Sequence, residues 1–178
     1  MSVKYYDWTA YHANMRGNKV AIIDLDTHNE VTYAQLDQRA ERLAAWLQGQ
    51  GVSKGDRVAL LTPNCPEVFE AEFACAKIGA ICIPLNWRLT VPELEYILND
   101  STPKVLIFDQ TFNEQASALQ ALCSFMHTLE VAMENASSSY ELALAGADEK
   151  CQAVECTHDD IAMIMYTSGT TGHPKGAM

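Results

Sequence analysis

The 178-residue sequence predicts an α/β fold, in which a parallel, doubly wound sheet has helices on both faces. Short apolar runs of strand length alternate along the chain with amphipathic stretches of helix length. Most of these runs are apolar at successive positions, which is typical of parallel strands that are buried on both sides. Repeated strand–helix–strand units of this kind form right-handed crossovers within one sheet.

A hairpin and a long helix open the predicted fold. Two short strands, Val20–Asp24 and Glu30–Thr32, flank a run of turn-forming residues. Thr32 then begins a helix with a capping box, because Gln35 stands at the third helical position. An apolar face continues along this helix until Gly49 ends it.

The remaining elements continue the alternation of strands and helices. A proline in the first turn and Gly79 as a stop delimit a helix over Pro66–Ile78. Further helices are expected from Thr90 to about Asn99, from Thr111 to about Ser124 and from Ser138 to Ala145. The predicted strands are Arg57–Leu61, Ile81–Ile83, Val105–Phe108, Thr128–Val131 and a final buried strand, Ile161–Tyr166.

The chain divides at one change in composition. Between Ala145 and Asp160, a glycine, charged residues and two cysteines interrupt the apolar rhythm. We therefore expect residues 1–147 to form an α/β subdomain and residues 148–160 to form a linker. Residues 161–178 would supply a strand and the loop that follows it.

The most specific motif lies at the end of the chain. Residues 166–176 read Tyr-Thr-Ser-Gly-Thr-Thr-Gly-His-Pro-Lys-Gly. Glycines let backbone N–H groups turn toward an anion, hydroxyl groups add donors, and a lysine suits a terminal phosphate. The predicted strand before it would place the loop where open α/β sheets bind ligands. The candidate phosphate-binding residues are Thr167, Ser168, Gly169, Thr170, Thr171, Gly172 and Lys175.

Other interpretations of this loop differ in spacing. A Walker A loop needs Gly-Lys-Ser or Gly-Lys-Thr where this chain has Pro174-Lys175-Gly176, and the dinucleotide fingerprint Gly-x-Gly-x-x-Gly is also missing. No nucleophile elbow surrounds Ser168, which favours a hydrogen-bond donor over an attacking group. A surface loop without function remains the alternative.

Composition excludes several classes of function. The chain has 12 basic and 23 acidic residues, and its net charge is −11 at pH 7. Such an acidic surface repels nucleic acid and anionic lipid, so we expect no nucleic-acid partner. No apolar run approaches the length of a membrane span and no signal-like core occurs in residues 1–20, so we expect no transmembrane segment and a cytoplasmic location.

The six cysteines predict thiols rather than a metal site. They include no Cys-x-x-Cys pair, so reduced core thiols are expected. Cys151, Cys156 and His158 match no common zinc spacing and lack a fourth ligand. We therefore predict no metal-ligating residue.

The motif at residues 166–176 resembles the signature loop of the AMP-forming adenylating enzymes. This superfamily comprises acyl- and aryl-CoA synthetases, peptide-synthetase adenylation domains and luciferases. Upstream segments resemble its earlier blocks in the same order, so the resemblance covers almost the whole chain: residues 31–36, 55–61, 63–64, 77–80 and 84–90. The segment Pro-Leu-Asn-Trp-Arg at 84–88 is more similar to acyl-CoA synthetases than to peptide-synthetase domains.

The resemblance implies an incomplete N-terminal portion of the large domain of an adenylating enzyme. In that superfamily the groups for adenine, ribose, acyl chain and magnesium, and a catalytic lysine, follow the loop, so no catalytic residue is expected in this chain. The parent protein would be an ATP-dependent carboxylate–CoA ligase that uses ATP, Mg²⁺ and CoA. The 178-residue chain alone would be inactive and would bind none of them tightly.

Two alternatives to this function stay open. The parent protein could be a peptide-synthetase adenylation domain, or the chain could be a non-catalytic module that self-associates or binds nucleotide weakly. We expect the isolated chain to form a homodimer, because the apolar strand at 161–166 would leave an unpaired sheet edge that a second copy could cover.

Overall fold

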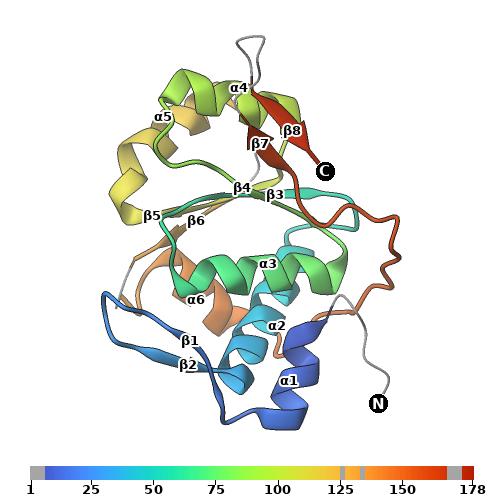
Figure 1. Cartoon of the computed structure of the whole chain (residues 1–178). Coiled ribbons are helices and arrows are strands. Elements are labelled where there is room, and N and C mark those ends of the chain that lie inside the picture. The colour runs from blue at the N-terminus through green and yellow to red at the C-terminus, as the bar shows by residue number, and fades with distance from the viewer. Residues whose placement is uncertain (1–6, 125–126, 133–134, 168–173) are drawn as a thin grey trace.

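A parallel sheet of four strands forms the centre of the protein. The computed structural model describes residues 7–124, 127–132, 135–167 and 174–178. The strands are β3 (Arg57–Leu61), β4 (Ile81–Pro84), β5 (Val105–Asp109) and β6 (His127–Val131), in the order β4-β3-β5-β6. Every neighbouring pair is parallel, as the apolar runs predict (Figure 1).

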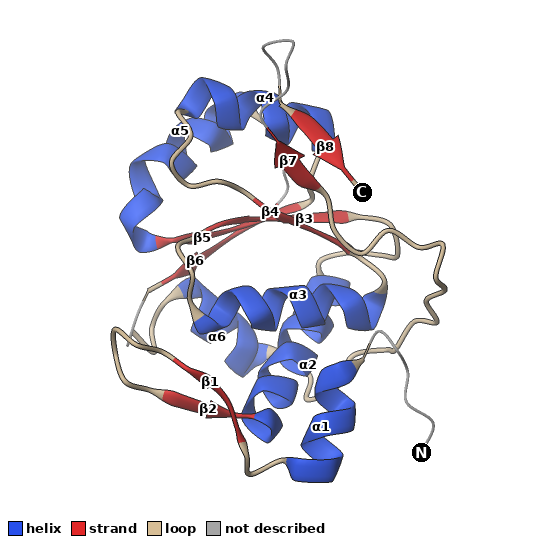
Figure 2. Ribbon diagram, viewed as in Figure 1, coloured by secondary structure: helices blue, strands red, loops and turns tan. Residues whose placement is uncertain are grey.

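Helices cover both faces of this sheet (Figure 2). On one face lie α2 (Tyr33–Gly49), α3 (Pro66–Ile78) and α6 (Ser139–Gly146), and on the other lie α4 (Val91–Ser101) and α5 (Asn113–Leu122), which follows the short 3₁₀ turn Gln110–Phe112. The doubly wound α/β prediction is therefore confirmed.

Successive strand residues supply two separate cores. In β3, Val58 and Leu60 belong to the cluster under α2, α3 and α6, whereas Ala59 and Leu61 belong to the cluster under α4 and α5. All four side chains are at most 3% exposed. A strand with helices on both sides needs apolar residues at every position, which explains the unbroken apolar runs of the sequence.

The N-terminal elements pack outside this core. The predicted hairpin forms from β1 (Val20–Ile23) and β2 (Glu30–Thr32), which pair antiparallel. The capping box of α2 is present, because Thr32 Oγ1 accepts from the Gln35 amide and Gln35 Oε1 accepts from the Thr32 amide. Helix α1 (Trp8–Arg16), which the sequence pattern did not predict, packs against α2.

The last predicted strand is wrong in its extent and burial. Within 161–166, Met163 forms one parallel bridge with Cys82 of β4. The chain then enters an antiparallel hairpin, β7 (Met165–Thr167) and β8 (Lys175–Ala177). Ile161 and Met165 are 38% and 56% exposed. The pairing with β4 covers a single residue pair, so the predicted strand does not extend the sheet over its whole length, although Met163, Ile164 and Tyr166 pack against the two cores.

Two sequence features have plain structural counterparts. All six cysteines are described, and none forms a disulfide. Within the described ranges, no helix combines the length and the apolar character needed to cross a bilayer.

Candidate functional site

The β7–β8 hairpin brings two of the predicted phosphate-binding residues together. Its register pairs Thr167 with Lys175, Tyr166 with Gly176 and Met165 with Ala177. Directly opposite residues of an antiparallel pair have Cβ atoms about 4.5–5.5 Å apart. Both Thr167 and Lys175 are exposed. A residue with a hydroxyl group and a residue with an ammonium group therefore face each other at the loop end of the hairpin.

The loop that joins these two strands is the rest of the predicted site. Ser168, Gly169, Thr170, Thr171 and Gly172 lie outside the described residues. Lys175 forms no ion pair with any residue that the structure describes.

Three kinds of contact fix the base of the hairpin. The backbone is joined to β4, because Cys82 O accepts from the Ile164 amide at 3.0 Å and the Cys82 amide donates to Ala162 O at 3.1 Å. Ile164 and Tyr166 pack against the apolar cluster under α4 and α5. The Tyr166 hydroxyl donates to Asp100 Oδ2 at the end of α4 over 2.5 Å.

The environment of Tyr166 keeps this hydroxyl protonated. Partial burial and the neighbouring Asp100 carboxylate both raise the pKa of the phenol well above its ordinary value. The side chain therefore acts as a hydrogen-bond donor over the physiological range of pH.

The segment predicted as a linker is bound to the body of the protein. Residues 148–160 contain no helix or strand. Gln48 and Gln152 exchange two hydrogen bonds of 2.7 and 2.8 Å, and Lys54 forms an ion pair of 2.6 Å with Asp160. Lys54 and the Thr157 amide lower the pKa of Asp160, whose carboxylate accepts from both. These contacts set the path of the chain that leads to the hairpin.

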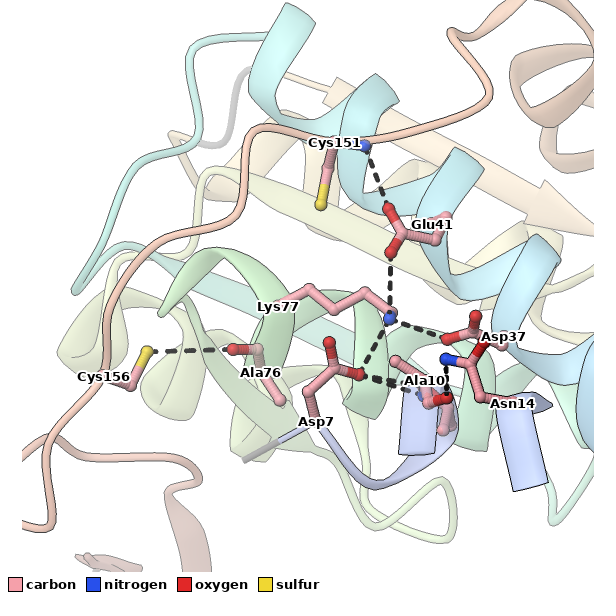
Figure 3. A network of polar contacts seen from close by, with 10 residues as sticks. Asp7, Ala10, Asn14, Asp37, Glu41, Ala76, Lys77, Cys151 and Cys156 are labelled. Atoms are coloured by element: carbon pink, nitrogen blue, oxygen red, sulfur yellow. Dashed lines mark hydrogen bonds and ion pairs between the residues drawn. The ribbon is translucent and has the colours of Figure 1, made fainter. Parts of the chain in front are cut away.

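A buried lysine joins this path to the N-terminal helices (Figure 3). Lys77 Nζ lies 2.9 Å from Asp7 Oδ1, 2.8 Å from Asp37 Oδ1 and 3.1 Å from Glu41 Oε1. The other oxygen of Glu41 accepts from the Cys151 amide at 3.1 Å. Burial alone would lower the pKa of Lys77, but the carboxylates outweigh it and raise that pKa above its ordinary value.

A cavity of about 610 Å³ lies at the ends of β5 and β6, and most of its wall comes from the β1–β2 hairpin, α2, α6 and the N-terminus of α3. Part of its wall is an ion network in which Arg39 contacts Glu70 at 2.6 Å and also Glu141. Burial raises the pKa of Cys65, also in the wall, to about 12, so this thiol is no ready nucleophile. The sequence pattern did not predict this cavity. No local sequence pattern marks it, because its wall combines residues of the β1–β2 hairpin, α2, α3 and α6 that lie far apart in the chain.

The described residues offer no metal site. Cys151, Cys156 and His158 do not converge, and no group of three or more His, Cys, Asp or Glu side chains in the described ranges could hold a metal ion.

Comparison with known proteins identifies the family. A family model described as AMP-binding enzyme matches residues 9–178. The chain belongs to this family. The resemblance of the motif at 166–176 to the adenylating enzymes is therefore confirmed.

Curated relatives of the chain are CoA ligases. The long-chain-fatty-acid–CoA ligase FadD13 of Mycobacterium tuberculosis is 42% identical over 158 residues, which cover 89% of this chain and 31% of that protein. A feruloyl-CoA synthase of Amycolatopsis is 40% identical over 171 residues, which cover 96% of this chain and 32% of that protein. The chain thus spans about a third of the length of these relatives.

Solved structures of adenylating enzymes share the fold. The N-terminal domain of FACL13 from Mycobacterium tuberculosis matches with a TM-score of 0.83 and 35% identity, covering 98% of this chain and 43% of that one. The anthranilate CoA ligase AuaEII in complex with anthranoyl-AMP matches with a TM-score of 0.88 and 30% identity, covering 99% of this chain and 35% of that one.

Proposed function

We propose that the protein containing this chain is an AMP-forming carboxylate–CoA ligase, and that this segment supplies its phosphate-binding loop. A carboxylate oxygen of the substrate attacks the α-phosphate of ATP and releases pyrophosphate, and the thiol of CoA then takes the acyl group from AMP. The observation that carries the proposal is the β7–β8 base, which holds Thr167 opposite Lys175 at the two ends of the family's signature loop.

The proposed role of the loop is to position phosphates and balance their charge. The chain has a net charge of −11, which repels ATP at long range, so nucleotide binding depends on local donors. Thr167 and Lys175, with Ser168, Gly169, Thr170, Thr171 and Gly172 between them, would hold the β- and γ-phosphates. Mg²⁺ would share the neutralisation of the leaving pyrophosphate.

The test is ATP–pyrophosphate exchange by the longer protein that contains this sequence, with a Lys175→Ala variant. One charge-assisted hydrogen bond is worth about 1.5–3 kcal/mol, so exchange at subsaturating ATP should fall roughly ten- to a hundredfold. Lys150→Ala is the matched control, because Lys150 is an exposed lysine in the predicted linker and forms no ion pair among the described residues. Equal exchange by the two variants would contradict the assignment of Lys175.

The carboxylic acid is proposed only as a class. The relatives named above are a long-chain-fatty-acid ligase and a feruloyl-CoA synthase, and an indoleacetate–CoA ligase of Aromatoleum aromaticum is 37% identical. The exchange assay therefore needs a panel of aliphatic and aromatic acids. The 178-residue chain alone is expected to give no exchange with any of them, because a loop without partners for the acid cannot position the reactants.

Organisation, location and self-association complete the proposal. We propose the division into residues 1–147, 148–160 and 161–178, which is supported by the absence of helix or strand in 148–160. A cytoplasmic location is consistent with six cysteines outside disulfides.

The exposure of Ile161 and Met165 supports a homodimer of the isolated chain. Light scattering that gives the monomer mass of 19.7 kDa at micromolar concentration would contradict the dimer.

A further inference from the structure

We propose that Tyr166 and Asp100 form a positioning pair that sets the base of the phosphate-binding loop. The inference rests on the proposed function, because it assigns a role within the same site. Tyr166 directly precedes Thr167, and its hydroxyl donates to Asp100 Oδ2 at 2.5 Å. Asp100 belongs to α4, 66 residues earlier in the chain. The pair thus joins the base of the loop to a helix of the main body.

The ring of Tyr166 can take this position because Gly176 stands opposite it. A Cβ atom on Gly176 would come within 3.3 Å of the Tyr166 Cζ and within 2.8 Å of Ile164 Cγ2. Real Cβ atoms essentially never show the shorter of these distances. A side chain at 176 would therefore displace Ile164 and crowd the Tyr166 ring, and the glycine leaves both in place.

The hairpin needs such an attachment because it is small. It has three residue pairs, and two-stranded hairpins of this kind are marginal on their own in water. Its backbone is tied to β4 at Ala162 and Ile164, before the first of those pairs. Among the described residues, the hydroxyl of Tyr166 attaches the hairpin to α4 one residue before Thr167. Displacement of this point would move Thr167 and Lys175 together relative to any bound phosphate.

The simplest competing view is that Tyr166 serves only as an apolar ring in the core. The Tyr166→Phe variant separates the two views, because it keeps the ring and removes the donor. Asp100→Ala removes the acceptor, and Asp100→Asn keeps an acceptor oxygen but removes the charge. Matched controls are Tyr33→Phe, whose ring lies in the distant aromatic group around His12, and Asp148→Asn, an exposed carboxylate outside the site.

The first readout is steady-state kinetics of the longer protein, with the melting temperature measured beside it. Loss of one hydrogen bond to an exposed charged group should raise the KM for ATP about three- to tenfold. The KM for the carboxylic acid and the melting temperature should stay at the control values. A merely structural role would instead lower the active fraction, and hence kcat, without a change in KM. The double variant Tyr166→Phe/Asp100→Ala should have a KM for ATP no higher than that of either single variant, because both changes remove the same hydrogen bond.

Replacing Asp100 has two effects on the KM for ATP, and they have opposite signs. Removing the negative Asp100 weakens long-range repulsion of ATP and would lower its KM, whereas loss of the positioning contact raises it. We expect the KM for ATP of Asp100→Asn to lie between the values of the wild type and Asp100→Ala, because an amide oxygen still accepts from the phenol. A KM below the wild-type value in all Asp100 variants would overturn the proposal.

The second readout needs no activity. Trypsin cleaves after Lys175 only when β8 leaves its partner, so the cleavage rate reports the opening of the hairpin. In the 178-residue chain, Tyr166→Phe and Asp100→Ala should accelerate the loss of residues 176–178 about three- to tenfold, as measured by mass spectrometry. If the wild type shows no pyrophosphate exchange but these variants open faster, the proposed function fails and the positioning pair stands. Cleavage at the control rate would overturn the positioning pair, whatever the kinetics show.

Discussion

Replacing Lys77 by methionine should destabilise the protein strongly. The side chain is 1% exposed, and its ammonium group lies within 3.1 Å of carboxylate oxygens on Asp7, Asp37 and Glu41. Methionine has a similar length and no charge, so the Lys77→Met variant leaves three carboxylates facing one another without a cation.

The size of the effect follows from the exposure of the partners. Unit charges about 3 Å apart attract by about 5–6 kcal/mol at an effective dielectric constant near 20, before the cost of desolvation is subtracted. Removing one member of a buried pair costs about 3–5 kcal/mol in net stability. The three carboxylates are 17–20% exposed and can turn toward water, so we expect about 3 kcal/mol, the lower limit of that range. For a domain of this length, that corresponds to a fall in Tm of about 6–12 °C.

Thermal unfolding monitored by circular dichroism at neutral pH measures this change. Lys150→Met is the control, and its effect should stay within about 0.5 kcal/mol because Lys150 is exposed. A Tm of Lys77→Met equal to that of Lys150→Met would refute the reasoning.

Two further predictions concern local features of the fold. The partly buried Asp56 accepts from Lys104 at 2.6 Å; burial opposes its ionisation, but this contact and the Ser53 amide lower its pKa below the ordinary value of 3.8. The stability it contributes is present above that value and is lost as the pH falls through the lowered pKa, so the Tm gap between wild type and Asp56→Asn should begin to shrink only as the pH falls below about 3.8. Gly79 has a φ of 70°, and an added Cβ would meet the Lys54 side chain at 2.9 Å, so Gly79→Ala should cost about 1–2 kcal/mol in a urea titration. Gly146→Ala should be neutral or stabilising in the same titration, because nothing lies within 4 Å of its Cβ position.

The central sheet could be predicted because its signals are local. Unbroken apolar runs identify strands that are covered on both sides, and a capping box such as Thr32 with Gln35 fixes a helix start within four residues. Helix α1 escaped prediction because its position depends on distant residues. Its N-cap residue, Asp7, is held by Lys77, 70 positions later in the chain. The only sequence signal for that contact is a lysine in the apolar run Ala71–Ile78.

The candidate site could be predicted in composition but not in shape. Glycines, hydroxyls and Lys175 predict a phosphate loop from residue chemistry alone. The antiparallel pairing of Thr167 with Lys175 is invisible in the sequence, because glycine and lysine are poor strand formers and the strands have three residues each. The Tyr166–Asp100 contact depends on the docking of the hairpin against α4, which no local pattern encodes.

We assign stability to the contacts of Lys77 and propose phosphate positioning for the contact of Tyr166. The two kinds of variant can therefore be combined in one protein. Lys77 lies among α1, α2 and α3 on one side of the sheet, whereas Tyr166 reaches α4 on the other side. Lys77→Met should therefore lower the Tm and leave the KM for ATP unchanged at temperatures well below unfolding. Tyr166→Phe should raise that KM and leave the Tm unchanged. Because sites far apart without shared partners contribute additively, the double variant should show both changes at their single-variant sizes, within about 0.5 kcal/mol. A KM for ATP that rises in Lys77→Met would mean that the N-terminal helices also set the position of the hairpin, through Glu41, Cys151 and the bound segment that follows them.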